Sequence, residues 1–487
     1  MKKFGLGVLL LLLLFVAYIL VKTFTFTSNQ LEVAPIEKIG IDDAAVLRLQ
    51  EALRIKTISF ENEEDFDPVP FEAFNALLAR NYPLIDSLLE HQLFSEFSHL
   101  YKWEGADKNL KPIVLMGHID VVPIASPTKW SVDPFGGEIK DGKIWGRGTI
   151  DDKFSVIGIL ESVEMLLKEG HRPKRSIYLA FGHDEEIGGE KGAVLIAQHL
   201  ASEGVQAEFV LDEGYAITQK LVPGIDTDVA MIGVGEKGST TIEFTVDMEG
   251  GHSSQPAKET AIDVLATAIS KLKTNPLDAS LSAAMNGFMD QLGPEMGFVN
   301  KMAFANRGLF KGIIIGTYEN ASNAGNALVR STTAPTIFEA GIKENVIPTY
   351  ARAVVNFRIV PGQTADDIMQ HASTVIDDER VVAKFFGFNT EPSPVSPQDS
   401  YGYKAINKTI KQTFEKTLTG PNLVIAATDS RHFTGVSSNI YRFVPYHINE
   451  DNINTFHGID ERIPIADYKD AIRFYVQLIK NTSTLVH

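Results

Sequence analysis

The sequence predicts an α/β protein in which a mixed sheet is flanked by helices and interrupted by an inserted ferredoxin-like α+β domain. From position 113 onward, short apolar runs alternate with glycine-rich turns, which predicts buried strands at 113–116, 176–181 and 207–211. Between the first two strands, 153–169 carries apolar residues at helical spacing. Strands that alternate with helices in this way are typical of a sheet with helices on its faces.

The chain begins with an apolar segment, 4–21, that is long enough to cross a bilayer as one helix. Lys2 and Lys3 precede it, so the positive-inside rule keeps the N-terminus in the cytoplasm and sends the rest of the chain across the membrane. The alternative is a signal peptide that is cleaved before secretion, but no small-x-small pattern follows Val21. We expect a single-pass membrane protein whose linker, 23–41, leads to a folded part on the non-cytoplasmic side.

Near position 238 the pattern changes. The order strand, helix, strand, strand, helix, strand predicts a ferredoxin-like layer. Its strands are expected at 239–248, 333–340, 351–359 and 381–386, and its helices at 259–272 and 364–376. Helices at 404–416 and 467–479 then return to the first domain. The prediction is a large domain in two parts, 42–234 and 393–487, with an insert at 238–390.

Composition limits the chemistry that the chain can support. The chain has no cysteine, so any metal must be held by histidine, aspartate or glutamate. Its formal net charge of −17 over 487 residues argues against a nucleic-acid partner, which requires a basic surface. The length also exceeds what one hydrophobic core usually supports, which agrees with more than one domain.

Methionine and phenylalanine are concentrated within 281–310, which holds Met285, Phe288, Met289, Met296, Phe298, Met302, Phe304 and Phe310. Such side chains can form an adaptable apolar surface suited to a long acyl chain. The alternative is the packing of two helices into the core of the insert, because these residue types are normally buried.

Acidic and imidazole residues follow the predicted strands. His118 and Asp120 end the first strand, where alternate residues share a face, so Asp120 can hold one nitrogen of His118 while the other meets a metal. Asp151 lies in a glycine-rich turn before a helix, where a helix-capping role is the alternative. Glu185 and Glu186 follow the second strand and could divide metal binding and proton transfer, unless they form a solvated surface.

Two further motifs complete this set: Asp212 in Leu-Asp-Glu-Gly and His457 in Phe-His-Gly. Zinc in hydrolases favours imidazole nitrogen and carboxylate oxygen. Open α/β sheets place their sites at the carboxyl ends of strands, where most of these residues fall. The sequence therefore predicts a two-zinc hydrolytic site, although the same ligands also accept Mn²⁺ or Co²⁺.

The order of the motifs resembles the aminoacylase/carboxypeptidase family of di-zinc metallopeptidases, and within it the branch of carboxypeptidase S and the N-fatty-acyl-amino-acid synthase/hydrolases. The motifs are His-x-Asp, Gly-Arg-Gly-x-x-Asp-Asp-Lys, Asp-Glu-Glu-x-Gly-Gly, Leu-Asp-Glu-Gly, Gly-Gly-His-Ser-Ser, Asn-x-Ile-Pro followed by Asn-Phe-Arg, and a late His-Gly. The match covers nearly everything after the apolar segment. The resemblance implies a zinc-peptidase-like fold whose insert is a lid or dimerisation domain.

The resemblance also implies a set of metal ligands. Asp151 would bridge two zinc ions, and the peptide bond that follows it would be cis. His118 and Asp212 would complete the protein ligands of one ion. Glu186 and His457 would complete those of the other.

Three further residues would serve the reaction. Glu185 would act as general base and then as general acid, while Asp120 holds His118. His252, from the insert, would stabilise the oxyanion. In many relatives this histidine comes from a partner subunit, so the resemblance includes a homodimer among the expected assemblies.

The substrate would be gripped through its carboxylate or carbonyl. Asn345 and Arg358 resemble residues with this role, and Arg431 is a further candidate because a guanidinium group suits bidentate binding. A surface ion pair is the alternative for each arginine. The implied activity is hydrolysis, with reversible synthesis, of N-fatty-acyl amino acids. The alternatives are carboxypeptidase or dipeptidase action on small peptides, and a non-catalytic amino-acid receptor displayed on the membrane.

Overall fold

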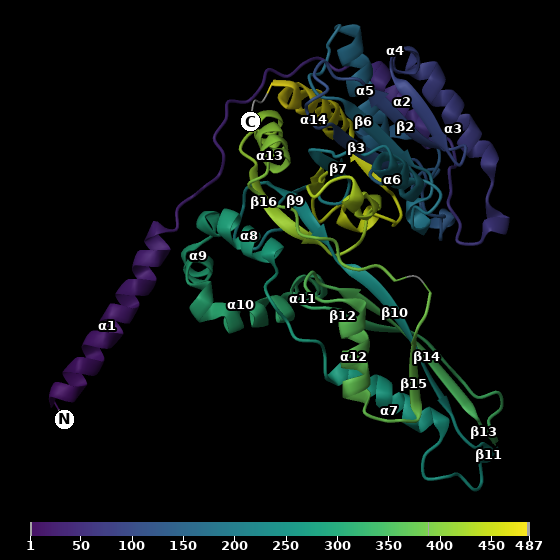
Figure 1. Cartoon of the computed structure of the whole chain (residues 1–487), viewed down its shortest axis with the longest axis vertical. Helices are drawn as coiled ribbons and strands as arrows, with labels where there is room; N and C mark the ends of the chain where they lie inside the picture. Colours follow the sequence, from purple (N-terminus) through teal and green to yellow (C-terminus); the bar gives the residue numbers. More distant parts are fainter. Residues whose placement is uncertain (1, 388, 485–487) are drawn as a thin grey trace.

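The computed structural model describes residues 2–387 and 389–484. Position 388 of the expected insert and positions 485–487 at the end of the expected large domain lie outside the described residues. The folded part contains a large sheet with helices on both faces and a smaller sheet that extends away from it (Figure 1). The two sheets are connected by β9 (Val229–Glu236) and β10 (Gly238–Asp247), which follow one another almost without interruption.

The large sheet is mixed, which confirms the predicted fold class. Its other strands are β1 (Glu90–Phe94), β2 (Ser98–Trp103), β3 (Ile113–His118), β6 (Ile177–Gly182), β7 (Phe209–Asp212), β8 (Ile217–Thr218), β16 (Leu418–Val424), β17 (Ile440–Arg442) and β18 (His447–Ile448). Their order is β1-β2-β6-β3-β7-β17-β9-β8-β18, and β16 pairs with β9. β3 is parallel to both β6 and β7, whereas β1, β2 and β6 pair in antiparallel fashion. The three predicted strands, β3, β6 and β7, therefore lie side by side in the centre.

Helices cover both faces of this sheet because its central strands are apolar on both sides. On β3, Ile113 and Leu115 belong to one core, and Val114 and Met116 belong to the other. The helices around the first core are α2 (Asp43–Leu53), α3 (Pro68–Asn81), α4 (Pro83–Leu88), α5 (Lys153–Lys168), α13 (Tyr401–Thr413) and α14 (Ile465–Thr484). α6 (Ala193–Ser202) packs into the second core.

The small sheet has the predicted ferredoxin-like order. Its strands after β10 are β12 (Thr332–Ala340), β14 (Tyr350–Ile359) and β15 (Val381–Phe385), arranged as β12-β14-β10-β15 with every pair antiparallel. Its core includes alternate residues of β10, namely Ile242, Phe244 and Val246. The helices that complete this core are α7 (Ala261–Thr274) and α12 (Ala365–Ile376). The exact boundaries of the insert remain predictions.

The structure contains two further small sheets. β11 (Gly251–His252) pairs with β13 (Val346–Ile347) at the tip of the insert that is farthest from the large sheet (Figure 1). β4 (Glu138–Lys140), β5 (Lys143–Trp145) and β19 (Arg462–Pro464) form the other. The second sheet brings the segment before Asp151 beside the segment after His457.

The methionine- and phenylalanine-rich segment forms α8 (Ala283–Leu292), α9 (Phe298–Ala305) and the start of α10 (Arg307–Ala321), and α11 (Asn323–Val329) follows. Phe288, Met289 and Phe304 pack with Met231 of β9 in a cluster that is separate from the core of the insert. The alternative that these helices pack into the core of the insert is therefore wrong. An amphipathic helix buries its apolar face but does not specify which sheet receives it.

The apolar N-terminal segment forms one long helix, α1 (Lys2–Thr25), that projects away from the folded part (Figure 1). Residues Lys3–Thr25 are long and apolar enough to cross a membrane, a property that a signal sequence shares. The linker that follows contains neither helix nor strand before α2. The remaining helical turns are the 3-10 helices η1 (Glu63–Asp65), η2 (Pro127–Lys129), η3 (Glu185–Ile187), η4 (Gly293–Glu295), η5 (Asp429–Gly435) and η6 (Ile453–Thr455).

Candidate metal centre

His118 is the last residue of β3 and is buried. Its Nδ1 lies 3.3 Å from Oδ1 of Asp120 and 3.1 Å from the carbonyl oxygen of the same residue. Asp120 is held in turn, because Ser59 Oγ donates to Oδ2 at 2.6 Å and the backbone N–H of Glu185 donates to Oδ1 at 3.2 Å. Burial opposes ionisation of Asp120, but its bonds to His118 and Ser59 outweigh burial and lower its pKa. The other ring nitrogen of His118 is thereby aimed at the centre of the site.

Asp151 lies between two histidines that come from distant parts of the chain. Its Oδ1 is 3.0 Å from Nε2 of His118, and its Oδ2 is 2.7 Å from Nε2 of His457. Asp151 precedes α5 in the glycine-rich turn, and the peptide bond between Asp151 and Asp152 is cis, as expected. Burial opposes the ionisation of Asp151, but its contacts with His118 and His457 and the charges of the two rings outweigh burial and lower its pKa.

The loop that carries His457 is fixed to the turn that carries Asp151. The Arg147 guanidinium donates through Nη1 to Oε2 of Glu461 at 2.6 Å and through Nη2 to the carbonyl oxygens of His457 and Gly458 at 3.2 and 2.9 Å. Oε1 of Glu461 accepts from the backbone N–H of Ile150 at 2.9 Å. The sequence reasoning missed Arg147 and Glu461 as site-building residues. The Gly-Arg-Gly motif is the signal that could have indicated Arg147.

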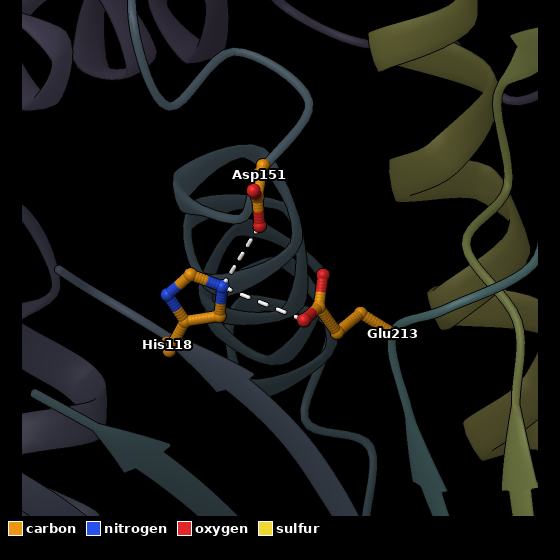
Figure 2. Close-up of side chains that lie close together, drawn as sticks. All are labelled: His118, Asp151 and Glu213. Atoms are coloured by element: carbon orange, nitrogen blue, oxygen red, sulfur yellow. Dashed lines mark hydrogen bonds and ion pairs between the residues drawn. The ribbon is translucent and has the colours of Figure 1, made fainter. Parts of the chain in front are cut away.

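Glu186 and Glu213 complete two clusters that share Asp151. Oε2 of Glu186 lies 3.3 Å from Nε2 of His457, and Oε1 of Glu213 lies 3.5 Å from Nε2 of His118. Figure 2 shows His118, Asp151 and Glu213 pointing toward one another. In each cluster the candidate ligand atoms all lie within 4.8 Å of one another.

The structure brings Glu213, rather than the expected Asp212, into contact with His118. Asp212 is the last residue of β7, and its Oδ2 accepts from the backbone N–H of Ser430 at 2.8 Å. Successive residues of a strand point to opposite faces, so only one member of the Asp-Glu pair can face this centre from a regular strand. The signal for Glu213 was present in the motif Leu-Asp-Glu-Gly.

The donor set fits a divalent cation. Oδ2 of Asp151 and Oε1 of Glu186 are buried and accept no hydrogen bond within the described chain. Burial, together with the charge of Asp151, raises the pKa of Glu186, and the same two causes raise the pKa of Glu213 to about 8. Buried carboxylates that crowd together in this way repel one another until a cation neutralises them. Imidazole nitrogen and carboxylate oxygen are ligands that zinc accepts.

Glu185 belongs to η3, next to Glu186. Burial, assisted by neighbouring carboxylates such as Asp429 and Glu213, raises the pKa of Glu185 well above its ordinary value, against the opposing charge of His118. The environment of Glu185 therefore favours a carboxyl group that can hold a proton, which is the property required of a general acid and base.

Two insert residues expected at the site, His252 and Asn345, are remote from this centre within one chain. His252 is exposed in β11, and its Nδ1 accepts from Ser254 Oγ at 2.8 Å. The carbonyl oxygen of Asn345 accepts from the backbone N–H of Ser253 at 3.2 Å, so Asn345 and His252 lie together at the tip of the insert. Figure 1 shows this tip well away from β3 and β7.

Two of the expected substrate-binding residues lie within electrostatic reach of each other. Arg358 is near the end of β14, and Arg431 belongs to η5 of the large domain. Burial and then the positive charge of Arg431 lower the pKa of Arg358. Nη2 of Arg431 donates to the carbonyl oxygen of Gly188, close to Glu185 and Glu186 in the sequence, at 3.1 Å. Two neighbouring guanidinium groups favour the binding of a carboxylate.

An apolar cavity of about 380 Å³ lies among α8, α9, α10 and β9. Its lining includes Met231, Met285, Phe288, Met296 and Phe304. The apolar cluster around this cavity also contains Tyr215, two residues after Glu213, whose hydroxyl donates to the carbonyl oxygen of Leu423 at 2.8 Å. The apolar cluster around the cavity therefore includes a residue close in sequence to the candidate ligand Glu213.

Comparison with known proteins identifies relatives over most of the chain. The model described as peptidase family M20/M25/M40 matches residues 114–481. The chain is 42% identical to the probable carboxypeptidase S-like 2 of Dictyostelium discoideum, over 98% of this chain and 92% of the relative. It is 43% identical to the N-fatty-acyl-amino acid synthase/hydrolase of Xenopus tropicalis, over 90% of this chain and 85% of the relative.

A solved structure shares the fold. The M20 family metallo-carboxypeptidase of Sulfolobus solfataricus superposes with a TM-score of 0.63 at 20% identity. The match covers 91% of this chain and all of that chain (100%). The arrangement of the large sheet and its insert is therefore shared with a metallo-carboxypeptidase.

Proposed function

The chain belongs to peptidase family M20/M25/M40, and on this basis we propose that it hydrolyses the amide bond between a fatty acyl group and a free amino acid at a two-zinc centre. The family makes it a metal-dependent hydrolase of the peptidase type. The identity and number of the ions, the roles of the residues and the acyl substrate are the proposed parts.

The observation that carries the proposal is the position of Asp151, whose two carboxylate oxygens approach different histidines. We assign His118, Asp151 and Glu213 to one ion and Asp151, Glu186 and His457 to the other. Asp212 stays a candidate ligand for the first ion because it directly precedes Glu213.

When bound, the ions would acidify a water molecule and polarise the amide carbonyl. Glu185 would receive the proton of that water at its carboxylate and deliver it to the leaving nitrogen. Its buried surroundings support this role because they favour the protonated form between the two transfers. Asp120 would hold Nδ1 of His118 and so keep the ring in one orientation.

Arg358 and Arg431 would bind the carboxylate of the amino-acid part of the substrate. Arg358 belongs to the insert and Arg431 to the large domain, and the electrostatic coupling between their positive charges supports this assignment. His252 would stabilise the oxyanion, with Asn345 beside it. Because both lie at the tip of the insert, we assign them to the site of a second copy in a homodimer.

The apolar cavity supports a fatty acyl substrate, because its methionine and phenylalanine lining can adapt to a flexible hydrocarbon chain. Carboxypeptidase or dipeptidase action is the second candidate, favoured by the relative described as carboxypeptidase S-like. In either case α1 would anchor the enzyme with its folded part on the non-cytoplasmic side. Cleavage of α1 as a signal peptide remains the alternative.

The test compares two substrates that share one leaving amino acid. The full chain, with zinc supplied, is given N-oleoyl-phenylalanine or a dipeptide that ends in phenylalanine, and released phenylalanine is measured. Higher kcat/KM for the oleoyl compound is the expected result. Preference for the dipeptide would contradict the fatty acyl assignment, and release from neither would favour the non-catalytic receptor.

A further inference from the structure

Large apolar side chains are exposed together on α9 and α10. Phe298 and Val299 belong to α9, and Leu309 and Ile313 belong to α10. Val299 is 71% exposed and Ile313 is 66% exposed. We name these four residues the α9–α10 surface. Apolar groups gathered on one surface are typical of a contact with protein or lipid.

This surface continues directly from the candidate membrane span. The rings of Phe24 in α1 and Phe298 in α9 lie 6.2 Å apart. Asn306 Nδ2 donates to Oγ1 of Thr23 at 3.2 Å and to the carbonyl oxygen of Ile19 at 3.3 Å. Figure 1 shows α9 beside the end of α1 that is nearest to the folded part, and α10 next to α9. A bilayer crossed by α1 would therefore reach α9 and α10.

The charges of this region differ from those of the whole chain. Positions 297–313 contain Lys301, Arg307 and Lys311 as their charged residues, all of them basic, whereas the chain as a whole has a net charge of −17. Arg307 is paired with Asp290 of α8, which leaves Lys301 and Lys311 as the basic groups that could meet lipid headgroups. Apolar side chains interspersed with lysine and arginine are typical of helices that lie in the interface of an anionic membrane. The long stems of lysine and arginine let their charged ends reach the headgroups.

The apolar cavity opens at the same surface. Val299 and Ile313 line the cavity and are also highly exposed. The opening therefore lies beside residues that favour lipid over water. A lipid-like molecule could move from the bilayer into the cavity without passing through water.

We propose that the α9–α10 surface lies in the interfacial layer of the bilayer that α1 crosses, so that the cavity opens toward lipid. This proposal rests on the proposed membrane anchorage by α1. It adds a route for the acyl substrate, which enters the cavity laterally from the membrane.

The absence of cysteine from the chain permits a direct test with single labels. Val299→Cys and Ile313→Cys are each labelled with an environment-sensitive nitrobenzoxadiazole dye in the full chain. The labelled proteins are reconstituted into vesicles of phosphatidylcholine and phosphatidylserine, with or without lipid that carries a nitroxide on its acyl chain. Leu14→Cys in α1 is the positive control. Val69→Cys in α3, where the native side chain is 65% exposed, is the matched exposed control.

The proposal expects nitroxide quenching of the dyes at positions 299 and 313 to be several-fold stronger than at position 69. Phe298→Cys and Leu309→Cys, which do not line the cavity, provide a second labelled pair with the same expectation. Quenching at all four positions equal to that at position 69, with strong quenching at position 14, would overturn the proposal. Weak quenching at position 14 as well would overturn both the anchor and the proposal. Amide hydrolysis by the same preparations tests the proposed function separately.

Discussion

Oδ2 of Asp151 lies 2.7 Å from Nε2 of His457. Among the described residues, no group donates a hydrogen bond to this buried oxygen, which is the relation expected of two atoms that are ligands of one ion. Arg147, which lies four residues before Asp151 in the sequence, maintains this relation because its side chain binds the backbone of His457. The proposed centre therefore depends on contacts between segments that lie about 310 residues apart in the sequence.

Glu185 is expected to be essential for turnover but not for metal content. Glu185→Gln retains the shape of the side chain but removes its capacity to exchange a proton, so kcat should fall by about 10²–10⁴-fold. Zinc content, measured by mass spectrometry, should stay unchanged. Glu190→Gln, at an exposed position nearby, is the control. Normal turnover in Glu185→Gln would show that the assigned role is wrong.

Replacement of Glu213 should affect metal binding more than replacement of Asp212. Glu213 approaches His118, whereas Asp212 binds the backbone of Ser430. Zinc titrations of Glu213→Gln and Asp212→Asn should show the larger loss of affinity in the first variant. A larger loss in Asp212→Asn would restore the ligand set that the family resemblance implies.

Arg147 should act as a positioning residue for His457. Arg147→Met removes both the ion pair with Glu461 and the bonds to the backbone of the His457 loop. Loss of such supporting contacts should weaken zinc binding by about 10–100-fold, measured by competition with a chelator. Arg147→Lys should recover part of this affinity, and Arg80→Met, in a surface ion pair, should leave it unchanged. Equal zinc affinity in all these proteins would contradict the positioning role.

His252 should act on the site of a partner subunit. Chains with His252→Ala and chains with Glu185→Gln should each be nearly inactive. If they are mixed and allowed to exchange subunits, each mixed dimer should contain one intact site. In a random mixture about half of the dimers are mixed, and each mixed dimer has one working site out of two. The mixture should therefore recover about one quarter of the normal activity. No recovery despite exchange would assign His252 to its own chain or to no catalytic role.

Stability should depend on pH through His99. This histidine is buried in β2, with Nε2 2.8 Å from Oδ1 of Asn75, and burial, followed by the charge of His91, lowers its pKa to about 3. The unfolded chain binds a proton at His99 below about pH 6.5, whereas the folded chain does not until about pH 3. The free energy of unfolding should fall by about 1.4 kcal/mol for each pH unit between these limits.

Denaturant unfolding at pH 7 and pH 5 tests this expectation. His99→Gln should lose less stability than the original chain between the two pH values, because glutamine does not titrate. His371→Gln, at a half-buried position, should behave like the original chain. Identical pH dependence in all three proteins would exclude His99 as a source of acid sensitivity.

The sequence predicted the elements whose patterns are local. The central strands were predictable because every residue from Ile113 to Met116 is apolar, which is typical of a strand covered on both faces. The pairing of His118 with Asp120 was predictable because alternate positions at a strand end share one face. The order of strands and helices along the insert was predictable because the spacing of apolar residues changes between strand and helix periodicity.

Other features depend on contacts that no local pattern contains. The sequence could not show which of Asp212 and Glu213 is the metal ligand, because both residue types bind metals. The direction in which a side chain at a strand end points depends on the residues packed around it. The contact of Arg147 with the loop of His457 joins segments that lie far apart in the sequence. The packing of α8 and α9 on the large sheet could not be inferred from their apolar faces, and the boundaries of the domains remain predictions.

The central claim is that two zinc ions, held around Asp151, permit amide hydrolysis. The most direct measurement is a zinc titration of the metal-free full chain, followed by release of phenylalanine from N-oleoyl-phenylalanine. The account predicts no activity without metal, a rise that ends at about two zinc ions per chain, and no recovery in Asp151→Ala. Activity that persists without metal, or that survives in Asp151→Ala, would contradict the account.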